Sequence, residues 1–196
     1  MKKFLVDLTA IKRVDPVPLR KALETYKKAK SEVAGGKGRL LAIQKEIDDF
    51  LAGTNADDTE RLQIISAKQL QVQILPNLIR RVEKQIDSDL FRALLKEAHQ
   101  FQHAIIDFYS SAANETARQI ATYFRPFISQ EGVALDVALR FSDDCKVVGG
   151  RIGAAQAITL PNELMGRSSY SERDKESIDR EIIEAAVQLL ALASKS

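Results

Sequence analysis

The feature that most constrains the fold is an unbroken seven-residue spacing of apolar and small residues between positions 19 and 50. One heptad position holds Leu19, Tyr26, Val33, Leu40 and Ile47, and the position three residues later holds Ala22, Ala29, Gly36, Ile43 and Phe50. Such a spacing is typical of a helix that packs lengthwise on another helix, as in a coiled coil. It predicts one long helix over about residues 17–52, which begins at Pro16 and Pro18 and ends at Gly53.

Three glycines lie inside this predicted helix, at Gly35, Gly36 and Gly38. Each costs roughly 1 kcal/mol relative to alanine in a helix interior, so a loop is the competing interpretation. A loop would have no reason to keep the heptad phase from Val33 to Leu40. We therefore expect a continuous helix that is weakened, and bent, at the glycines.

Residues 53–58 form a predicted turn, after which a second helix returns antiparallel to the first. Its apolar residues again recur at steps of three and four: Ile65, Val72, Leu75, Ile79, Val82 and Ile86. Pro76 lies within this pattern and costs roughly 3 kcal/mol in a helix interior. If the hairpin turns near residue 55, Gly36 faces about residue 73, so the glycines and Pro76 would form a joint hinge. A shift of one turn in the register would separate them.

The apolar spacing slips between Ile86 and Ala98, where four-residue steps replace the heptad before it resumes at Phe101. An insertion of four residues locally unwinds a coiled coil. A helix break with Asp87 or Ser88 as the N-cap is the alternative.

The C-terminal third differs in composition. A short helix is predicted over residues 130–141, and an irregular loop over 142–170, where Gly149 and Gly150 could turn a small β-hairpin between Val147 and Ile152. Ser171 and Asp174 resemble a capping box that opens a last helix to about Ser194. The fold prediction is thus all-α: an extended basic arm over 1–16, an elongated antiparallel helical hairpin or coiled-coil bundle over 17–127, and a smaller helical part over 128–196 with at most one β-hairpin.

The charge is unevenly distributed, although the net charge is only +2. Residues 1–39 hold eleven Lys and Arg against four acids, and the candidate basic surface on the first helix comprises Lys27, Lys28, Lys30, Lys37 and Arg39. This segment could bind nucleic acid. Alternatively, it solubilises one helix face or pairs with acids elsewhere, since aromatic residues for base stacking are scarce in it.

The most specific ligand-like pattern is His99, His103 and Asp107, spaced four apart on one helical face. Histidines at i and i+4 can hold zinc, but position 100 is Gln, so the pattern lacks the glutamate of a catalytic HExxH site. A polar border beside Phe101 and Ile105 is the alternative. The single cysteine, Cys145, can form no intramolecular disulfide, and Gly149-Gly150-Arg151-Ile152-Gly153 departs from the phosphate-binding glycine patterns. We expect no cofactor.

These observations favour a non-enzymatic assembly or adaptor protein, because the sequence contains no complete catalytic constellation. No charge-free apolar stretch could span a bilayer, and Asp7, Lys12 and Arg13 interrupt any signal sequence, so we expect a cytoplasmic protein. The partner is expected to be another protein, a second copy of the chain, or both. The candidate interaction seam comprises Leu19, Tyr26, Val33, Leu40, Ile43, Ile47, Phe50, Ile65, Val72 and Ile79.

The hairpin also carries apolar residues that lie off this seam: Leu41, Leu51, Leu62, Ile64, Leu70, Ile74 and Leu78. A monomer would leave them as an exposed apolar band. Acids surround the tip of the hairpin, namely Glu46, Asp48, Asp49, Asp57, Asp58 and Glu60, whereas the bases lie lower on the first helix. The sequence therefore predicts a dimer in which two hairpins pair antiparallel.

Overall fold

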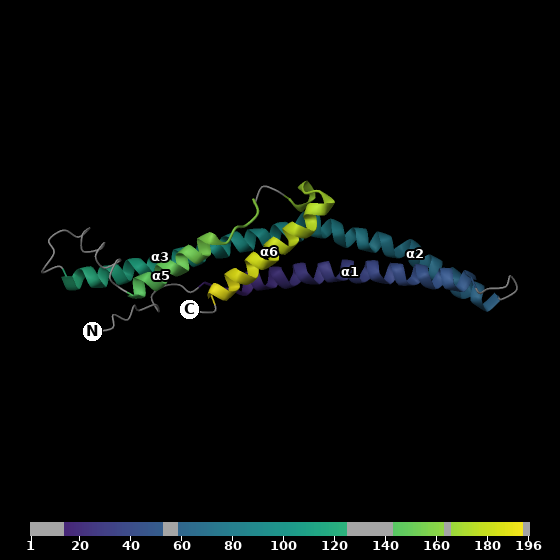
Figure 1. The fold of residues 1–196 in the computed structure, drawn as a ribbon, viewed down its shortest axis with the longest axis horizontal. Coiled ribbons are helices and arrows are strands. Elements are labelled where there is room, and N and C mark those ends of the chain that lie inside the picture. Colours follow the sequence, from purple (N-terminus) through teal and green to yellow (C-terminus); the bar gives the residue numbers. More distant parts are fainter. Residues whose placement is uncertain (1–13, 53–58, 125–142, 163–165, 194–196) are drawn as a thin grey trace.

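The computed structural model describes residues 14–52, 59–124, 143–162 and 166–193, and these ranges form an elongated all-α protein without strands (Figure 1). Helices α1 (Val17–Ala52) and α2 (Thr59–Gln85) pack antiparallel and make up one end of the molecule. A π-helical turn (Ile86–Leu90) joins α2 to α3 (Phe91–Phe124), which extends the rod to the other end. Helices α5 (Asp143–Ala157) and α6 (Glu172–Ala193) pack on α3, and a 3-10 turn (Arg167–Ser169) precedes α6. The predicted all-α fold is confirmed.

Helix α1 begins as the sequence indicates. The side chain of Asp15 accepts a hydrogen bond from the backbone N–H of Val17 at 2.9 Å, and the carbonyl of Pro16 accepts the first helical bond, from Arg20, at 3.0 Å. These contacts satisfy backbone groups that a helix terminus otherwise leaves unpaired. The helix then runs without interruption through the three glycines to Ala52, so the prediction from the heptad phase is confirmed.

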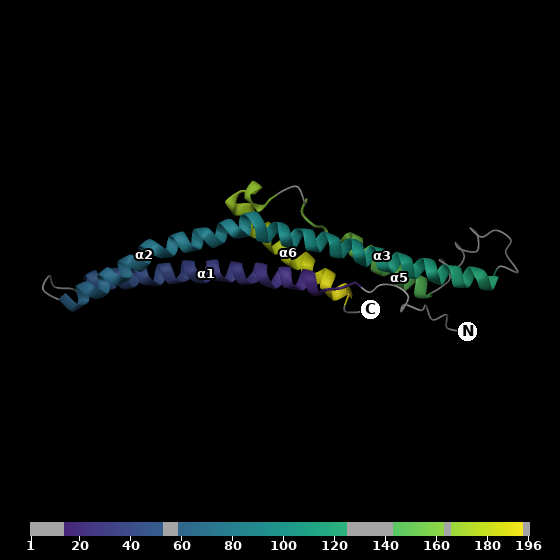
Figure 2. The ribbon, with the colours of Figure 1, turned by 180° about the vertical axis from the view of Figure 1, so that it is seen from behind.

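The second helix continues past Pro76, which lies inside α2. Seen from behind, α2 and α3 follow one long, gently bent path, while α1 lies beside α2 and beside the first part of α3 (Figure 2). The predicted turn over residues 53–58 lies outside the described residues. No helix in the described ranges is both long and apolar enough to cross a membrane.

The slip in the apolar spacing coincides with the π-helical turn. Ile86 opens this turn and is buried, and the next turn passes directly into α3 at Phe91. A π-turn places an extra residue in the helix and rotates the residues that follow it. The apolar residues of α2 and those of α3 therefore face the same side. The position of the slip is therefore confirmed. A break capped by Asp87 or Ser88 is wrong, because the helix continues.

The hydrophobic core lies in the body of the molecule, where α1, α3 and α6 meet. Its fully buried side chains include Leu19, Tyr26, Phe91, Leu94, Leu95, Ile105, Ile182 and Leu189. The outer part of the hairpin buries far less: among its described residues, only Ile47, Ile65 and Ile79 are buried. The hairpin is thus a two-helix projection from a three- to four-helix body.

The C-terminal part contains a helix that the sequence did not predict. Residues 143–157 form α5, so the expected β-hairpin between Val147 and Ile152 and the irregular character of that stretch are wrong. Gly149 and Gly150 are exposed on a helix that packs its other side against α3, where Ala155 is fully buried. The amide of Gln102 on α3 donates to the carbonyls of Ala155 and Ile158, both at 2.8 Å, and so satisfies the end of α5.

Helix α6 begins as predicted. The backbone N–H of Asp174 donates to the carbonyl of Ser171 at 3.0 Å and faces its hydroxyl at 3.4 Å, while that hydroxyl donates to the Asp174 carboxylate. The contact of the Asp174 N–H with the Ser171 hydroxyl is one half of a capping box, and the second bond joins the two side chains. The short helix predicted over 130–141 and most of the arm predicted over 1–16 lie outside the described residues.

Candidate functional site

The seam residues pack inside the chain. Leu19, Tyr26, Ile47, Ile65 and Ile79 are buried, and Val33, Leu40, Ile43, Phe50 and Val72 are half-buried between the two arms or against the body. Leu19 and Tyr26 belong to the core of the body, whereas the others lie along the two arms of the hairpin. Any surface offered to a partner must therefore consist of other residues.

A second set of apolar residues faces outward on the hairpin. All seven side chains that the sequence placed off the seam are exposed: Leu41, Leu51, Leu62, Ile64, Leu70, Ile74 and Leu78. Three of them lie four residues apart on α2 and are about half exposed, namely Leu70 at 56%, Ile74 at 49% and Leu78 at 53%. Residues with this spacing neighbour one another on a helix surface, so they form a continuous stripe, which we call the α2 stripe.

The α2 stripe lies in a segment without charge. Residues 69–79 contain no Lys, Arg, Asp or Glu, and their exposed polar positions are amides: Gln69, Gln71, Gln73 and Asn77. Most exposed helix faces carry charges, whereas the centres of protein interfaces are depleted of them. This combination of half-exposed aliphatic side chains and amides is suited to contact with another protein surface.

A groove lies between the two arms at the Leu78 end of the stripe. It measures about 450 Å³ and is lined on α1 by residues that include Ser31, Gly35 and Gly36, and on α2 by residues that include Leu78 and Ile79. Gly36 is needed here, because a Cβ at this position would lie 2.8 Å from Cγ1 of Ile79. Gly35 and Gly38 are different, since a Cβ at either position would meet nothing within 4 Å. Of these two glycines, Gly35 lines the groove.

The proposed hinge has no direct geometric support. Gly36 contacts Ile79 rather than residue 73, so the glycines lie about one turn from Pro76, and both helices are continuous at these levels. Close approach of the two arms explains Gly36. A hinge formed by Gly35, Gly36, Gly38 and Pro76 stays a prediction.

The candidate basic surface is partly used within the chain. Lys30 pairs with Asp179 of α6, and Lys37 pairs with Glu83 of α2 at 2.7 Å. Lys27, Lys28 and Arg39 are exposed. Two of the five cations that the sequence singled out therefore tie α1 to its neighbours.

An ionic network that the sequence did not reveal lies where the hairpin joins the body. Arg167, from the 3-10 turn, donates through Nε and Nη2 to the two carboxylate oxygens of Asp179 at 2.7 and 2.9 Å. Its Nη1 donates to Asp87 in the π-helical turn, which Lys175 approaches at 3.4 Å. The hydroxyl of Tyr26 also donates to Asp179, next to the Lys30 ion pair. Four segments of the chain thus meet in this network: α1, the π-helical turn, the 3-10 turn and α6.

The network is closed to solvent at its centre, since Asp179 is 3% and Arg167 8% exposed. Burial alone would raise the pKa of Asp179, but hydrogen bonds from Arg167, Lys30 and Tyr26 outweigh this effect and hold the pKa below its ordinary value. Burial raises the pKa of the Tyr26 hydroxyl, and its bond to Asp179 adds to the rise. Both groups therefore keep one protonation state near neutral pH, which suits a structural junction.

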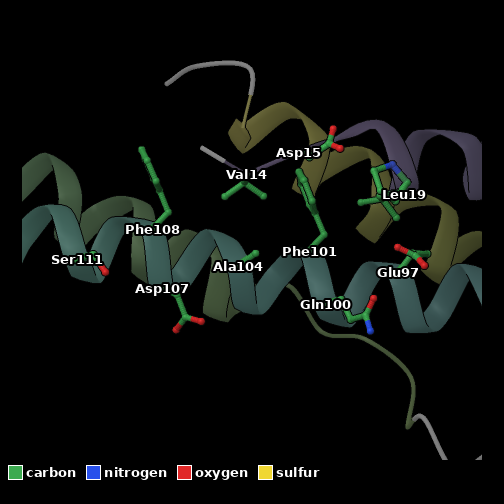
Figure 3. A pocket seen from close by; sticks show the side chains of 11 residues that line it. Val14, Asp15, Leu19, Glu97, Gln100, Phe101, Ala104, Asp107, Phe108 and Ser111 are labelled. Atoms are coloured by element: carbon green, nitrogen blue, oxygen red, sulfur yellow. The ribbon is translucent and has the colours of Figure 1, made fainter. Parts of the chain in front are cut away.

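A shallow groove of about 530 Å³ lies at the other side of the body, between the start of α1 and α3. Phe101 and Phe108 stand on either side of Val14, which lies over the small side chain of Ala104 (Figure 3). The acids Asp15, Glu97 and Asp107 are spread along it. Its apolar floor anchors the segment that leads into α1.

The three candidate metal ligands gain no further ligand from another element in the described part of the chain. His99 Nε2 lies 3.0 Å from the carbonyl oxygen of Pro161, in hydrogen-bond contact, while His103 and Asp107 are exposed on α3. Among the residues that the structure describes, no group of three or more His, Cys, Asp or Glu is arranged to hold a metal ion. Metal binding through His99, His103 and Asp107 stays a prediction.

Comparison of this chain with protein-family models, with curated proteins and with solved structures gives no match.

Proposed function

We propose that this protein is a non-enzymatic helical assembly or adaptor protein that binds another protein surface through the outer part of the α1–α2 hairpin. The observation that carries the proposal is the α2 stripe, Leu70, Ile74 and Leu78, exposed within the charge-free segment 69–79. Apolar side chains gathered in this way on a soluble protein commonly mark an interaction site.

The architecture supports this proposal. The core and the Asp179 network hold α1, α3 and α6 together at the base, whereas the hairpin projects with one side of each arm uncovered. A rigid base with a projecting arm presents its surface at a fixed orientation, so a partner can bind without ordering a loop.

The test uses the full chain with Leu70 and Ile74 replaced by Gln, which keeps helix propensity and removes the apolar contact area. Proteins cross-linked to the wild-type chain in native cells should be lost from the double variant. The matched control is Val187→Gln, which changes an exposed apolar residue on α6, 45% exposed, outside the hairpin. An unchanged set of cross-linked proteins in the double variant would contradict the proposal.

A second candidate function is the binding of nucleic acid, because Lys27, Lys28 and Arg39 are exposed on α1. Binding of nucleic acid through these residues would weaken steeply as salt increases, since phosphate contacts release counterions. The variant Lys27→Glu/Lys28→Glu should then lose retention on RNA or DNA, whereas Leu70→Gln/Ile74→Gln should not. The opposite pattern is expected if the hairpin acts through protein contact.

A further inference from the structure

The α2 stripe belongs to a longer row of side chains that winds around α2. Steps of four residues extend it to Ser66 and Leu62 toward the tip of the hairpin, and to Val82 toward the body. Five of the six residues in this row are aliphatic, and all but Val82 are exposed. Residues four apart form ridges on a helix surface, and these ridges are inclined by about 26° to the helix axis. The α2 stripe is therefore the middle of an apolar ridge that crosses α2 obliquely.

The middle of this ridge faces away from the rest of the hairpin. The side chains of α2 that lie toward α1 include Ile65, Val72 and Ile79. Leu70 comes between the first two of these in the sequence and points to the opposite side of the helix. Leu78 lies at the edge of the hairpin, where it lines the groove between the arms. The outer side of a helix is convex, so only a concave partner surface can surround the ridge.

The surroundings of the ridge are polar but uncharged. Gln71 and Asn77 each lie one turn from Ile74, on opposite sides of the ridge, and residues 69–79 contain no charged side chain. A charged group of a partner would lose its water here without gaining a counter-charge. Complementarity therefore requires a partner surface that is uncharged as well.

A second copy of the chain meets these requirements poorly. Grooves on its described part contain charged residues: Glu32 and Arg39 in the groove beside Leu78, Asp48 in a groove nearer the tip, and Asp15, Glu97 and Asp107 in the groove on the body. Two copies that met ridge to ridge would join two convex surfaces. The three half-exposed side chains of each stripe would then bury far less than the about 800 Å² that each partner contributes to a stable interface.

We propose that the ridge inserts into an uncharged, apolar groove on another protein, and that this groove runs obliquely across α2. The inference rests on the proposed function and names the chemistry of the partner surface and its direction. Leu70, Ile74 and Leu78 fill the groove, and the amides of Gln71 and Asn77 lie at its polar rim. A groove that ran along α2 would instead contact residues at seven-residue steps, because these form a line nearly parallel to the helix axis.

The first experiment maps which positions on α2 the partner covers. The photo-reactive residue p-benzoylphenylalanine replaces one exposed residue at a time in the full chain, in native cells. Ser66 and Leu78 test the oblique ridge, whereas Gln63 and Lys84 lie at seven-residue steps from Leu70 and test the line along the helix. Probes at Ser66 and Leu78 should cross-link to the same other protein, and probes at Gln63 and Lys84 should not.

Three outcomes of this mapping overturn the inference. Cross-links from Gln63 and Lys84 in place of Ser66 and Leu78 exclude the oblique direction. A cross-linked product at twice 21.8 kDa that contains only this chain identifies a second copy as the occupant. The absence of any cross-link from the ridge means that nothing covers it.

The second experiment tests the charge of the groove. Gln71→Glu and Gln71→Lys introduce opposite charges beside Ile74 and have helix propensities close to that of glutamine, so both variants should keep the melting temperature of the wild type. Each should lower the yield of the cross-link from Ser66 at least about tenfold, because an uncharged groove desolvates either charge. Gln63→Glu and Gln63→Lys are the controls and should leave the yield unchanged. A loss with one sign and a gain with the other overturns the inference, as does a wild-type yield from both Gln71 variants.

Failure of the inference can be distinguished from failure of the proposed function. If Leu70→Gln/Ile74→Gln loses its cross-linked proteins while the probes follow seven-residue steps, or the two Gln71 variants differ in sign, the inference fails and the proposed function stands. If the double variant keeps all its cross-linked proteins, both fail.

Discussion

At the scale of single residues, Asp179 shows how a buried charge can be stabilised. Its carboxylate is nearly inaccessible, yet three side chains from other segments donate hydrogen bonds to it. A paired, hydrogen-bonded carboxylate can stay ionised inside a protein. Tyr26 and Lys30 lie one turn apart on α1, but they are 153 and 149 residues from Asp179, so no local spacing rule could have predicted the cluster. The exposed apolar residues could be predicted, since each falls off a regular heptad.

Replacing Asp179 with Ala should destabilise the protein by about 3–5 kcal/mol, because Arg167 would remain buried without its main counter-charge. Urea denaturation followed by circular dichroism measures the change in the free energy of unfolding. Asp174→Ala serves for comparison, since that carboxylate is exposed at the start of α6 and its loss should cost far less. Equal losses of unfolding free energy for the two variants would show that the buried network stabilises the fold no more than an exposed carboxylate does.

The same carboxylate predicts a dependence on pH. The folded protein holds the pKa of Asp179 below its ordinary value, so its charged form stabilises the fold at every pH above that ordinary value. The contribution should disappear as the pH falls below about 4 and through the lowered pKa. The difference in unfolding free energy between wild type and Asp179→Asn should therefore be constant from pH 6 to 8 and shrink in acid. A difference that persists unchanged in acid would contradict this assignment.

At the scale of helices, heptad spacing predicted the long elements well. Both bounds of α1 followed from the spacing and its flanking prolines and glycine, and the slip after Ile86 marked the π-helical turn. The spacing could not distinguish a π-turn from a break, because both displace the apolar stripe by a similar amount. The glycines of α5 misled the prediction for a different reason: packing of α5 against α3 overrides the local preference of Gly149 and Gly150 for a turn.

The glycines of α1 should respond in opposite directions to the same substitution. Gly35→Ala should stabilise the chain by up to about 1 kcal/mol, because it improves helix propensity at an open position. Gly36→Ala should destabilise it by about 1–3 kcal/mol, since its Cβ meets Ile79 and forces the arms apart. Chemical denaturation at low protein concentration compares the two. Stabilisation by both variants would mean that the arms do not approach closely at Gly36.

At the scale of the whole molecule, the stability is unevenly distributed. The body packs α1, α3, α5 and α6 around one core, whereas the outer hairpin has only two helices and few buried side chains. Regions with few buried contacts open locally at a lower free-energy cost than the core. The heptads predicted both long arms, but they could not show that α6 crosses over only the inner part of α1, since that depends on contacts far apart in the sequence.

This uneven distribution predicts a graded pattern of amide hydrogen exchange. Amides in residues 91–108 and 178–189 should be the slowest, because they surround the core, and amides in residues 60–74 should exchange orders of magnitude faster in a single chain. Equal protection of hairpin and body would mean that the outer arms are stabilised by something other than the core of the body.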